Sequence, residues 1–593
     1  MEKEYLQQAW KLDALYPGHE SQDFKQALET LEKQVEKFQD VREQLSEDIS
    51  RETFQDILSR VEELTELAHR LYGFAGLWFT EDTQNQAAQA LRARMEQIMA
   101  KVQNRTLFFD LWWKKLDQEH AERLMADAGD LRYWLEEMRH FTPYTLSEPE
   151  EKVINIKNVT GFNALNTLYD QITNRYSYEL EVDGEVQELT RGQLMVYARH
   201  HDPELRAAAY QKLYQIYGDD GPILGQIYQT IVRDWHNENL DMRDYDSPIS
   251  VRNLRNDIPD QAVDTLLKVC LENAALFQRF FNLKARWLDV DKLRRYDVYA
   301  PVAESDKTYE FNQGVELVLD AFENFEPRIA ALAQQVLDDE HVDSEVRKGK
   351  QGGAFCWSVV PGISPWVKLN YQGKANDVAT MAHELGHAIH ALLAADHSIL
   401  TYHSSLPLAE NASTFGEMLL IDRLLKKEKD PAVRRDILFR QVDDAYATIM
   451  RQAFFAMFER TAHKMITDGA MVDEVADAYL KNLEEQFGDA VEISEEFKWE
   501  WVSIPHFYHT PFYVYAYAFG QLLVLSLYQR YQEEGEDFIP GYLSILEAGG
   551  SRSPAEILAE AEIDIESAEF WQGGFDVIAR MIEELEGLPI DKE

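Results

Sequence analysis

The sequence predicts a mainly α-helical protein with a small β-sheet. Apolar residues recur at three- and four-residue spacing along most of the 593-residue chain, as at Ile57, Val61 and Leu64. This spacing is typical of amphipathic helices. Strand-like alternation is confined to short segments, and an apolar content of 45% is enough to fill a large core. Together these observations predict packed helices that carry little sheet.

The elements follow in order along the chain. Residues 5–103 predict a bundle of about three long helices. The aromatic segment Leu107–Trp113 is interpreted as a helix that packs into a domain core. The clearest β-hairpin lies at residues 176–189, where two alternating segments flank Asp183-Gly184, a favoured two-residue turn. Helical patterns then continue nearly to Arg347.

The domain organisation is predicted from the hairpin and from the lack of a linker. We find no tandem repeat and no low-complexity linker in the sequence, so the lobes are expected to pack together. We predict an N-terminal helical domain over residues 1–190, which ends in the hairpin. A second domain over residues 191–593 carries the candidate site.

The most informative motif is His-Glu-Leu-Gly-His at residues 383–387, within a segment that reads as helix. Positions i and i+4 lie on one face of a helix, so His383 and His387 can offer two imidazoles to one ion. Glu384 projects beside them, where it can reach a water on that ion. This arrangement is the signature of a zinc hydrolase.

A catalytic zinc site needs a third protein ligand and an open position. Glu410 and Glu417 are seven residues apart on the next helix-like segment, so they share a face. We assign Glu410 as the ligand and Glu417 as the group that supports a ligand. His390 is interpreted as a packed histidine. Gly386 is unfavourable inside a helix by about 1 kcal/mol, which predicts a close backbone approach by another segment.

Several motifs together resemble the thimet-oligopeptidase-like zinc peptidases of family M3, and most closely their oligoendopeptidase F branch. The resemblance covers roughly residues 105–585 and is much more specific than the zinc motif alone. The motifs that carry it are residues 383–387, 410–417, 353–356, 365–371, 504–508, 511–515, 549–551 and 570–574.

The resemblance implies a fold and a set of ligands. Members of the family are two helical lobes around a deep channel that holds the zinc. The corresponding ligands here are His383, His387 and Glu410, with one Zn²⁺ per chain. Channel walls of this kind would exclude folded proteins and admit short peptides.

The tyrosine-rich segment that follows is expected to take part in the chemistry. Thr510-Pro511 predicts a helix start, which would place Tyr513 and Tyr517 on one face and Tyr515 on another. A phenol or imidazole about 3 Å from a developing oxyanion stabilises a tetrahedral intermediate.

Family members use a His and Tyr residues from this region as such donors. By that resemblance His506 and Tyr515 are the first choices as catalytic donors. Tyr508, His509 and Tyr513 come next, as substrate-contacting residues. The thimet branch has a glycine-rich loop here, whereas this chain has no glycine between Ser503 and Phe519.

The segment before the zinc helix is predicted to bind the substrate backbone. Residues 364–371 alternate as a strand does, and Asn376 or Asp377 is expected to cap the helix that follows. An exposed strand edge beside a metal can hold an extended peptide by main-chain hydrogen bonds. Trp366 is the candidate substrate-contacting residue on this strand.

These parts predict a zinc-dependent endopeptidase that hydrolyses internal bonds of short unstructured oligopeptides, with Glu384 as the general base. The first alternative is a carboxypeptidase-type zinc exopeptidase, since helical carboxypeptidases carry the same pentapeptide. The second is a non-catalytic peptide-binding protein, in which Glu384 would be dispensable.

The amino-acid composition limits the partners and the cellular location that we expect for this protein. With 105 acidic and 59 basic residues the net charge is −46, which disfavours binding to nucleic acid. Cys270 and Cys356 are the only cysteines, so no disulfide framework is expected. The segment Met1–Tyr5 lacks a signal-peptide pattern, and no apolar run reaches a membrane-spanning length. We therefore expect a cytoplasmic enzyme with peptide substrates and no membrane partner, and the oligomeric state is left open.

Overall fold

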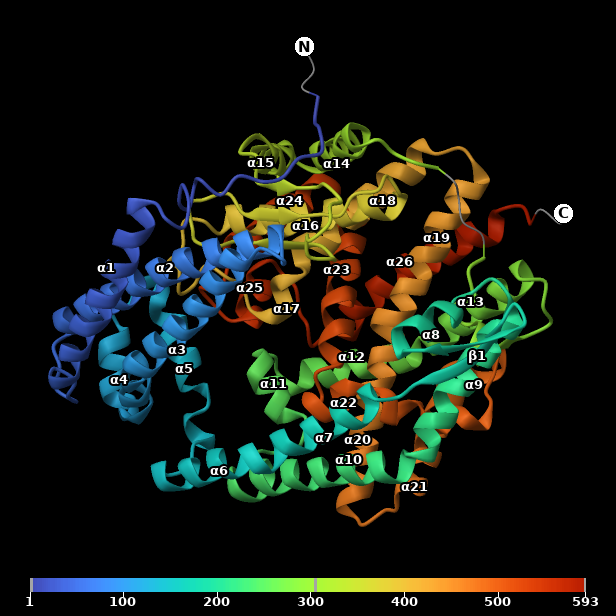
Figure 1. The fold of residues 1–593 in the computed structure, drawn as a ribbon, viewed down its shortest axis with the longest axis horizontal. Coiled ribbons are helices and arrows are strands. Elements are labelled where there is room, and N and C mark those ends of the chain that lie inside the picture. The colour runs from blue at the N-terminus through green and yellow to red at the C-terminus, as the bar shows by residue number, and fades with distance from the viewer. Residues whose placement is uncertain (1–3, 303–306, 591–593) are drawn as a thin grey trace. The chain divides into compact units, whose positions relative to one another are not determined.

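The computed structural model describes residues 4–302 and 307–590, which form a mainly α-helical protein (Figure 1). Met1–Lys3, on which part of the signal-peptide expectation depends, lie outside the described residues. The predicted fold class is confirmed, because strands are confined to short two- and three-stranded sheets in the described part of the chain.

The chain forms two compact units, each assembled from segments that are distant in sequence. Unit 1 comprises Met1–Thr142, Lys307–Lys427 and Arg530–Ile563. Unit 2 comprises Pro143–Asp306, Glu428–Gln529 and Asp564–Glu593. The division that we predicted between residues 190 and 191 is a different one and stays a prediction.

Unit 1 contains the helices that precede and surround the metal-binding motif. Its helices are α1 (Gln22–Gln39), α2 (Arg51–Glu81), α3 (Gln86–Lys115), α4 (Gln118–Met125), α5 (Arg132–His140), α14 (Phe311–Phe325), α15 (Pro327–Asp338), α16 (Ala375–Leu393), α17 (Leu406–Ala409), α18 (Asn411–Lys427), α24 (Ile539–Glu547) and α25 (Pro554–Glu560).

The N-terminal helices form the predicted bundle. Helices α1, α2 and α3 pack on one another. The side chain of Ser50 caps α2 by accepting a hydrogen bond from the backbone of Thr53. Ile57 and Leu64, from the predicted apolar stripe, are buried in the core that these helices share. The aromatic end of α3 buries Trp113, whose indole donates to the Leu135 carbonyl.

A three-stranded sheet lies beside α16, as predicted. Its strands are β4 (Val342–Asp343), β5 (Phe355–Trp357) and β6 (Trp366–Lys368), in the order β4-β6-β5. β6 is parallel to β4 and antiparallel to β5, and both β5 and β6 contact α16. β6 is therefore the central strand, and β5 forms the edge next to the helix.

Unit 2 is also helical and contains the hairpin. Its helices are α6 (Glu148–Thr160), α7 (Phe162–Asn174), α8 (Arg191–Tyr197), α9 (Pro203–Asp219), α10 (Gly221–His236), α11 (Ser250–Asn256), α12 (Asp260–Glu272), α13 (Ala274–Trp287), α19 (Pro431–Ala445), α20 (Arg451–Thr467), α21 (Val472–Phe487), α22 (Pro505–His509) and α26 (Ala568–Gly587); α23 (Tyr515–Glu534) begins in this unit, and its end belongs to unit 1.

The predicted hairpin is confirmed. β1 (Tyr178–Val182) pairs with β2 (Glu185–Leu189), and Asp183 and Gly184 between them both have positive φ. A two-residue turn with two positive φ angles matches the twist of the flanking strands. A second small sheet pairs β3 (Leu293–Arg294) with β7 (Val491–Glu492).

Within residues 4–302 and 307–590, none of the helices combines the length and the hydropathy that a bilayer crossing requires.

Candidate metal centre and active site

Helix α16 carries the metal-binding motif and is fixed at its start and at its middle. The carboxylate of Asp377, in the first turn, accepts hydrogen bonds from the backbone N–H groups of Lys374 and Gln372 at 3.0 and 2.9 Å. Of the two predicted capping residues, Asp377 is therefore the one that caps, and it does so from inside the helix. An acidic group in the first turn also interacts favourably with the positive N-terminal end of the helix dipole.

The middle of α16 crosses α18 at backbone contact. A Cβ at Gly386 would lie 2.5 Å from the carbonyl oxygen of Ala412 and 2.6 Å from the Cα of Ser413. A Cβ at Gly416 would in turn lie 3.1 Å from the carbonyl oxygen of Ala382. The predicted close approach at Gly386 is thus confirmed, and α18 is the approaching segment. This crossing brings Glu410, directly before α18, against the two histidines.

The three predicted ligands lie together. Nε2 of His383 and Nε2 of His387 are each 3.4 Å from Oε2 of Glu410. The three ligand atoms all lie within 4.8 Å of one another. Nitrogen and oxygen ligands bound at about 2.0–2.1 Å in a tetrahedral site are roughly 3.4 Å apart. The donor set and its spacing therefore fit a zinc ion with a fourth position left for water or substrate.

A second group of contacts orients these ligands. Nδ1 of His383 lies 2.5 Å from Oε1 of Glu417. The hydroxyl of Ser413 donates to Oε2 of Glu410 at 2.8 Å. A carboxylate on Nδ1 selects the tautomer that directs the Nε2 lone pair toward a metal. Glu417 thus lies where it can support His383, and Glu410 lies where it can bind a metal together with the two histidines.

The electrostatics of the cluster favour a bound cation. Burial lowers the pKa of His383, but its hydrogen bonds to the carboxylates of Glu410 and Glu417 raise it overall, to about 10. Burial raises the pKa of Glu410, yet His383 and His387 hold it well below its usual range. The cluster therefore attracts positive charge, and a divalent metal would supply that charge in place of protons.

Glu384 lies beside the ligands in a different environment. Its side chain is buried, and burial raises its pKa, although the neighbouring histidines oppose the shift. A carboxylate with a raised pKa is a better proton acceptor, and a better donor once it is protonated. The structure thus places the candidate general base where the sequence predicted it.

A cavity of about 490 Å³ opens at these residues. Its walls come from β5 and the residues flanking it, from α16, from the segment that precedes α17, and from the end of α17. The lining residues are Ala354, Phe355, Cys356, Ser358, His383, Glu384, His387, His390, Ala391, Tyr402, His403, Ser404, Ala409 and Glu410. His390 is buried, and burial lowers its pKa to about 4, so it is a neutral wall residue and not one of the three clustered ligands.

The strand prediction needs a correction. Residues 364–371 were expected to present an exposed edge, but β6 is the central strand and all its residues are buried. The expectation failed because strand order depends on distant pairing partners, which local alternation does not reveal. The edge beside the metal ligands is β5, and Phe355 and Cys356 from it line the cavity.

Trp366 lies away from the cavity. Its side chain is fully buried, its indole Nε1 donates to the carbonyl of Lys11 at 2.8 Å, and its ring stacks on His341 at 4.2 Å. It is therefore placed to join the N-terminal segment to the sheet.

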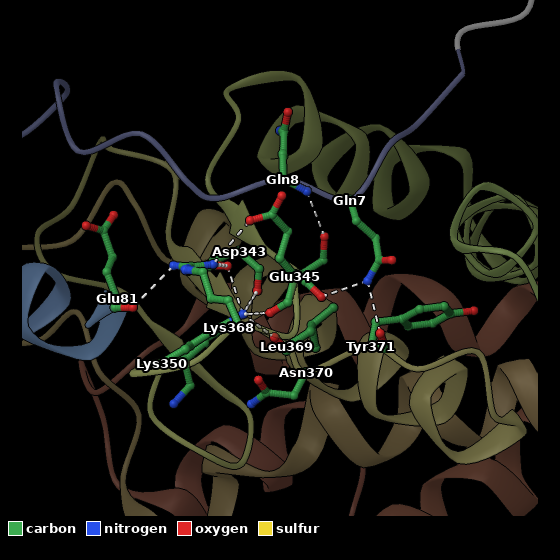
Figure 2. Close-up of polar contacts among 12 residues, drawn as sticks. Gln7, Gln8, Glu81, Asp343, Glu345, Lys350, Lys368, Leu369, Asn370 and Tyr371 are labelled. Atoms are coloured by element: carbon green, nitrogen blue, oxygen red, sulfur yellow. Dashed lines mark hydrogen bonds and ion pairs between the residues drawn. The ribbon is translucent and has the colours of Figure 1, made fainter. Parts of the chain in front are cut away.

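A polar network holds the turn that leads into β5, and Figure 2 shows its side chains Lys368 and Asn370 with the buried part around Asp343 and Lys350. Nζ of Lys368 donates to the carbonyls of Gln351 and Gly352, both at 3.1 Å. Nδ2 of Asn370 donates to the carbonyls of Gly353 at 2.8 Å and Gln351 at 3.3 Å. These two side chains therefore hold three successive backbone carbonyls of the turn, those of Gln351, Gly352 and Gly353.

The same network contains a buried ion pair. Lys350 Nζ lies 2.8 Å from Oδ1 of Asp343, and both side chains are completely buried. It also donates to the carbonyls of Glu345 and Leu369. We did not predict this network. The available signals were a lysine at 368 between apolar strand residues and a Gly-Gly pair earlier in the chain, at 352–353.

The tyrosine-rich segment belongs to unit 2 and folds differently from the prediction. The helix α23 begins at Tyr515, whereas Thr510 ends α22. The predicted helix start at Pro511 is wrong because Phe512 has a left-handed backbone, with φ 59°. The carboxylate of Glu459 accepts from the Phe512 N–H at 2.9 Å, and Arg252 donates to the Pro511 carbonyl at 3.2 Å.

The predicted donors in this segment have two kinds of environment. His506, Tyr513 and Tyr517 form a partly exposed group, in which the Tyr517 hydroxyl lies 3.4 Å from Nε2 of His506 and the Tyr513 and Tyr517 rings are 5.3 Å apart. Tyr513 and Tyr517 therefore lie side by side, although the helix starts later than expected. His509 is exposed and lies 3.0 Å from Asp170.

Tyr508 and Tyr515 are core residues of unit 2. Tyr508 is fully buried, and its hydroxyl donates to the Leu224 carbonyl at 3.4 Å. Tyr515 is also fully buried, and its hydroxyl accepts a hydrogen bond from Nδ2 of Asn256 at 2.9 Å. Helical spacing separated Tyr515 from the other two tyrosines, but it could not indicate which face is exposed.

Comparisons with known proteins agree with this geometry. Residues 196–577 match the sequence profile of Peptidase family M3, and residues 112–178 match that of Oligopeptidase F. Oligopeptidase PepF of Bacillus subtilis (strain 168) is 26% identical over 598 residues, which cover 98% of this chain and 87% of that protein. Group B oligopeptidase PepB of Streptococcus agalactiae is 27% identical over 90% of both chains.

Solved structures show the same fold. A crystal structure of oligoendopeptidase-F from Enterococcus faecium aligns with a TM-score of 0.69 at 25% identity, over 98% of this chain and 99% of the other. A structure of a Chlamydophila abortus protein aligns with a TM-score of 0.90 at 24% identity over 98% of both chains.

The fold and the histidine–glutamate cluster therefore define a peptidase, and the chain belongs to peptidase family M3. The match near the N-terminus and the similar proteins assign it to the oligopeptidase F branch of that family.

Proposed function

We propose that this protein is a zinc-dependent endopeptidase that hydrolyses internal bonds of short, unstructured peptides. The observation that carries the proposal is the spacing of His383, His387 and Glu410, which matches a tetrahedral zinc site, together with Glu384 beside them. The names of the similar proteins, oligopeptidase and oligoendopeptidase, support a short-peptide substrate.

When bound, zinc would act as a Lewis acid that polarises the scissile carbonyl and lowers the pKa of a water molecule. Glu384 accepts the proton of the attacking water and then gives it to the departing amine. Its burial supports both steps, because a raised pKa brings the carboxyl closer to the operating pH. Glu417 holds the ring of His383 in place throughout.

We propose that β5 binds the substrate backbone. It is an edge strand, and Phe355 and Cys356 from it line the cavity that contains the ligands. An extended peptide can add to such an edge by main-chain hydrogen bonds, which tolerate many side chains. The contacts of Lys368 and Asn370 with the preceding turn would keep this edge in a fixed position.

For stabilisation of the oxyanion we propose His506, on the basis of the family resemblance. Its partly exposed group in unit 2 also contains Tyr513 and Tyr517, whose hydroxyls we propose as further donors. The hydroxyl of Tyr515 is enclosed and bonded to Asn256, so we propose that Tyr515 positions the segment.

The exopeptidase alternative receives less support. An exopeptidase needs a charged group to bind a free terminus, and a carboxypeptidase needs a cation. The described residues that line the metal cavity include no lysine and no arginine. Lys368, on the strand next to β5, donates its ammonium hydrogens to the carbonyls of Gln351 and Gly352. These contacts compete with binding of a substrate carboxylate.

We further propose a cytoplasmic location. Cys270 and Cys356 are both free thiols, as expected for a protein of a reducing compartment.

The test is hydrolysis of a fluorogenic peptide blocked at both ends, by the zinc-loaded protein and by Glu384→Gln. Glu323→Gln, an exposed change on α14, is the matched control. We expect internal cleavage by the wild type and the control, and loss of at least about 10²-fold in Glu384→Gln at equal zinc content. Cleavage of free-ended peptides alone would support the exopeptidase, and equal activity in all three proteins would reject Glu384 as the base.

A further inference from the structure

A second, larger cavity adjoins the metal cavity within unit 1. It has a volume of about 890 Å³ and lies between α2, α3 and the residues that continue β5. Cys356, Ser358 and His403 line both cavities, so the two spaces adjoin at these residues. A peptide that pairs with the edge of β5 would run beside Cys356 and Trp357, which line this cavity.

One wall of the cavity is formed by close packing between α2 and the segment that contains β5. A Cβ at Gly73 would lie 2.4 Å from the Val359 side chain, and a Cβ at Gly76 would lie 2.5 Å from the Trp357 ring. Two glycines one turn apart on α2 therefore let the continuation of β5 press against the helix backbone. This contact fixes one wall, and α3 supplies the wall beside it.

The walls combine apolar and aromatic side chains with polar ones, most of which are uncharged. Aliphatic and sulfur-containing side chains come from Leu64, Ala68, Met99 and Val102, and aromatic ones come from Tyr72 and Trp357. The other lining residues are Thr65, His69, Glu96, Ala100, Gln103, Thr106, Cys356, Ser358, Val359 and His403.

The ionisable groups at the cavity add little charge. Glu96 is exposed and forms an ion pair with Arg92 at 3.1 Å. Burial lowers the pKa of His69 and of His403, so both imidazoles are neutral near pH 7. A pocket of this size, with apolar and aromatic side chains beside polar groups that are mostly uncharged, suits an uncharged group better than a charged one.

We propose that this cavity, which we call the α2–α3 subsite, receives a large uncharged side chain of the bound peptide, such as Phe, Tyr, Leu or Met. The proposal rests on the peptidase function proposed above and adds a substrate preference to it. Side chains of an extended peptide alternate in direction, so a residue close to the scissile bond can fill the subsite while its backbone pairs with β5. A charged side chain there would lose part of its hydration, and the one carboxylate among the described lining residues, that of Glu96, is already paired with Arg92.

The experiment uses peptides blocked at both ends, in which each position near the cleaved bond is in turn Phe, Leu, Asp or Lys. We expect one position at which Phe and Leu exceed Asp and Lys in kcat/KM by at least about tenfold, the order of discrimination that an apolar pocket gives. In Ala100→Trp the new side chain would occupy the subsite, and this preference should disappear. The matched control is Ala90→Trp, an exposed change on the same helix that does not line the cavity.

A second variant adds a negative charge to the wall of the α2–α3 subsite. Met99→Glu places a carboxylate in the wall, and we expect the preference at that same position to shift toward Lys. The proposal is overturned if Ala100→Trp and Ala90→Trp show equal profiles and Met99→Glu leaves the profile unchanged. Activity of the wild type, and its loss in Glu384→Gln, is measured in parallel, so failure of the subsite is distinguished from failure of the peptidase function.

Discussion

Gly386 and Ser413 meet backbone to backbone where α16 crosses α18. A Cβ at Gly386 would lie only 2.6 Å from the Cα of Ser413. This contact sets the separation between the helix that supplies two ligands and the segment that supplies Glu410. The hydroxyl of Ser413 also holds Glu410, so one crossing both positions and orients the third ligand.

Gly386→Ala is therefore expected to weaken both folding and metal binding. Alanine is better than glycine in a helix by about 1 kcal/mol, but the added methyl must displace backbone, and overpacking costs about 1–3 kcal/mol. Urea unfolding and zinc titration measure the two effects. Gly192→Ala, in the helix α8 with open space around its Cβ position, is the control and should be neutral or stabilising. Equal behaviour of the two variants would contradict this account of the crossing.

Glu417→Gln tests the orientation of His383. The amide retains the shape of the carboxylate but lacks its charge, so the imidazole becomes a weaker donor to metal. Loss of such a supporting contact typically lowers metal affinity by about 10–100-fold. Competition with a chelator measures the zinc affinity, with Glu323→Gln as the control on α14. Unchanged affinity would show that the 2.5 Å contact between Glu417 and His383 does not support the ligand.

The metal cluster was predictable because its geometry is mostly local. His387 follows His383 by four positions, and that spacing alone places the two side chains on one helical face. The need for a close approach at Gly386 was also visible, since glycine is costly inside a helix. The identity of the approaching helix was not visible, because it depends on tertiary packing.

The failures have a common physical cause. Whether β6 is an edge or a central strand depends on its pairing with β4 and β5, and β4 lies more than twenty residues earlier in the chain. The left-handed backbone at Phe512 depends on Glu459 and Arg252, which are distant in sequence. The interleaving of segments in the two units is likewise set by long-range contacts.

Lys368 gives a prediction about pH and stability. Burial lowers its pKa from 10.5 to about 8 in the folded protein. Between these values the unfolded chain holds the proton and the folded chain does not, so stability should rise with pH. The gain is at most about 1.4 kcal/mol per pH unit.

The difference in unfolding free energy between the wild type and Lys368→Met isolates this effect from other groups that titrate in the same range. Urea unfolding at several pH values between 7.5 and 9.5 should show the wild type gaining stability relative to the variant. If the difference in unfolding free energy between the two proteins stayed constant over this pH range, Lys368 would keep an ordinary pKa despite its burial.

Tyr515→Phe and His506→Ala separate a positioning role from a direct role in catalysis. Phenylalanine at 515 leaves Nδ2 of Asn256 unpaired in the core, which should cost about 1–3 kcal/mol of stability. His506 is partly exposed, so its loss should change stability little; if it donates to the oxyanion, kcat falls by about 10²–10³-fold. Thermal unfolding measures the stability, and kcat, measured well below the unfolding temperature of each variant, measures the catalytic effect. A large fall in kcat for Tyr515→Phe with unchanged KM and zinc content would instead assign the donor role to Tyr515, because only a group that acts in the transition state lowers kcat alone.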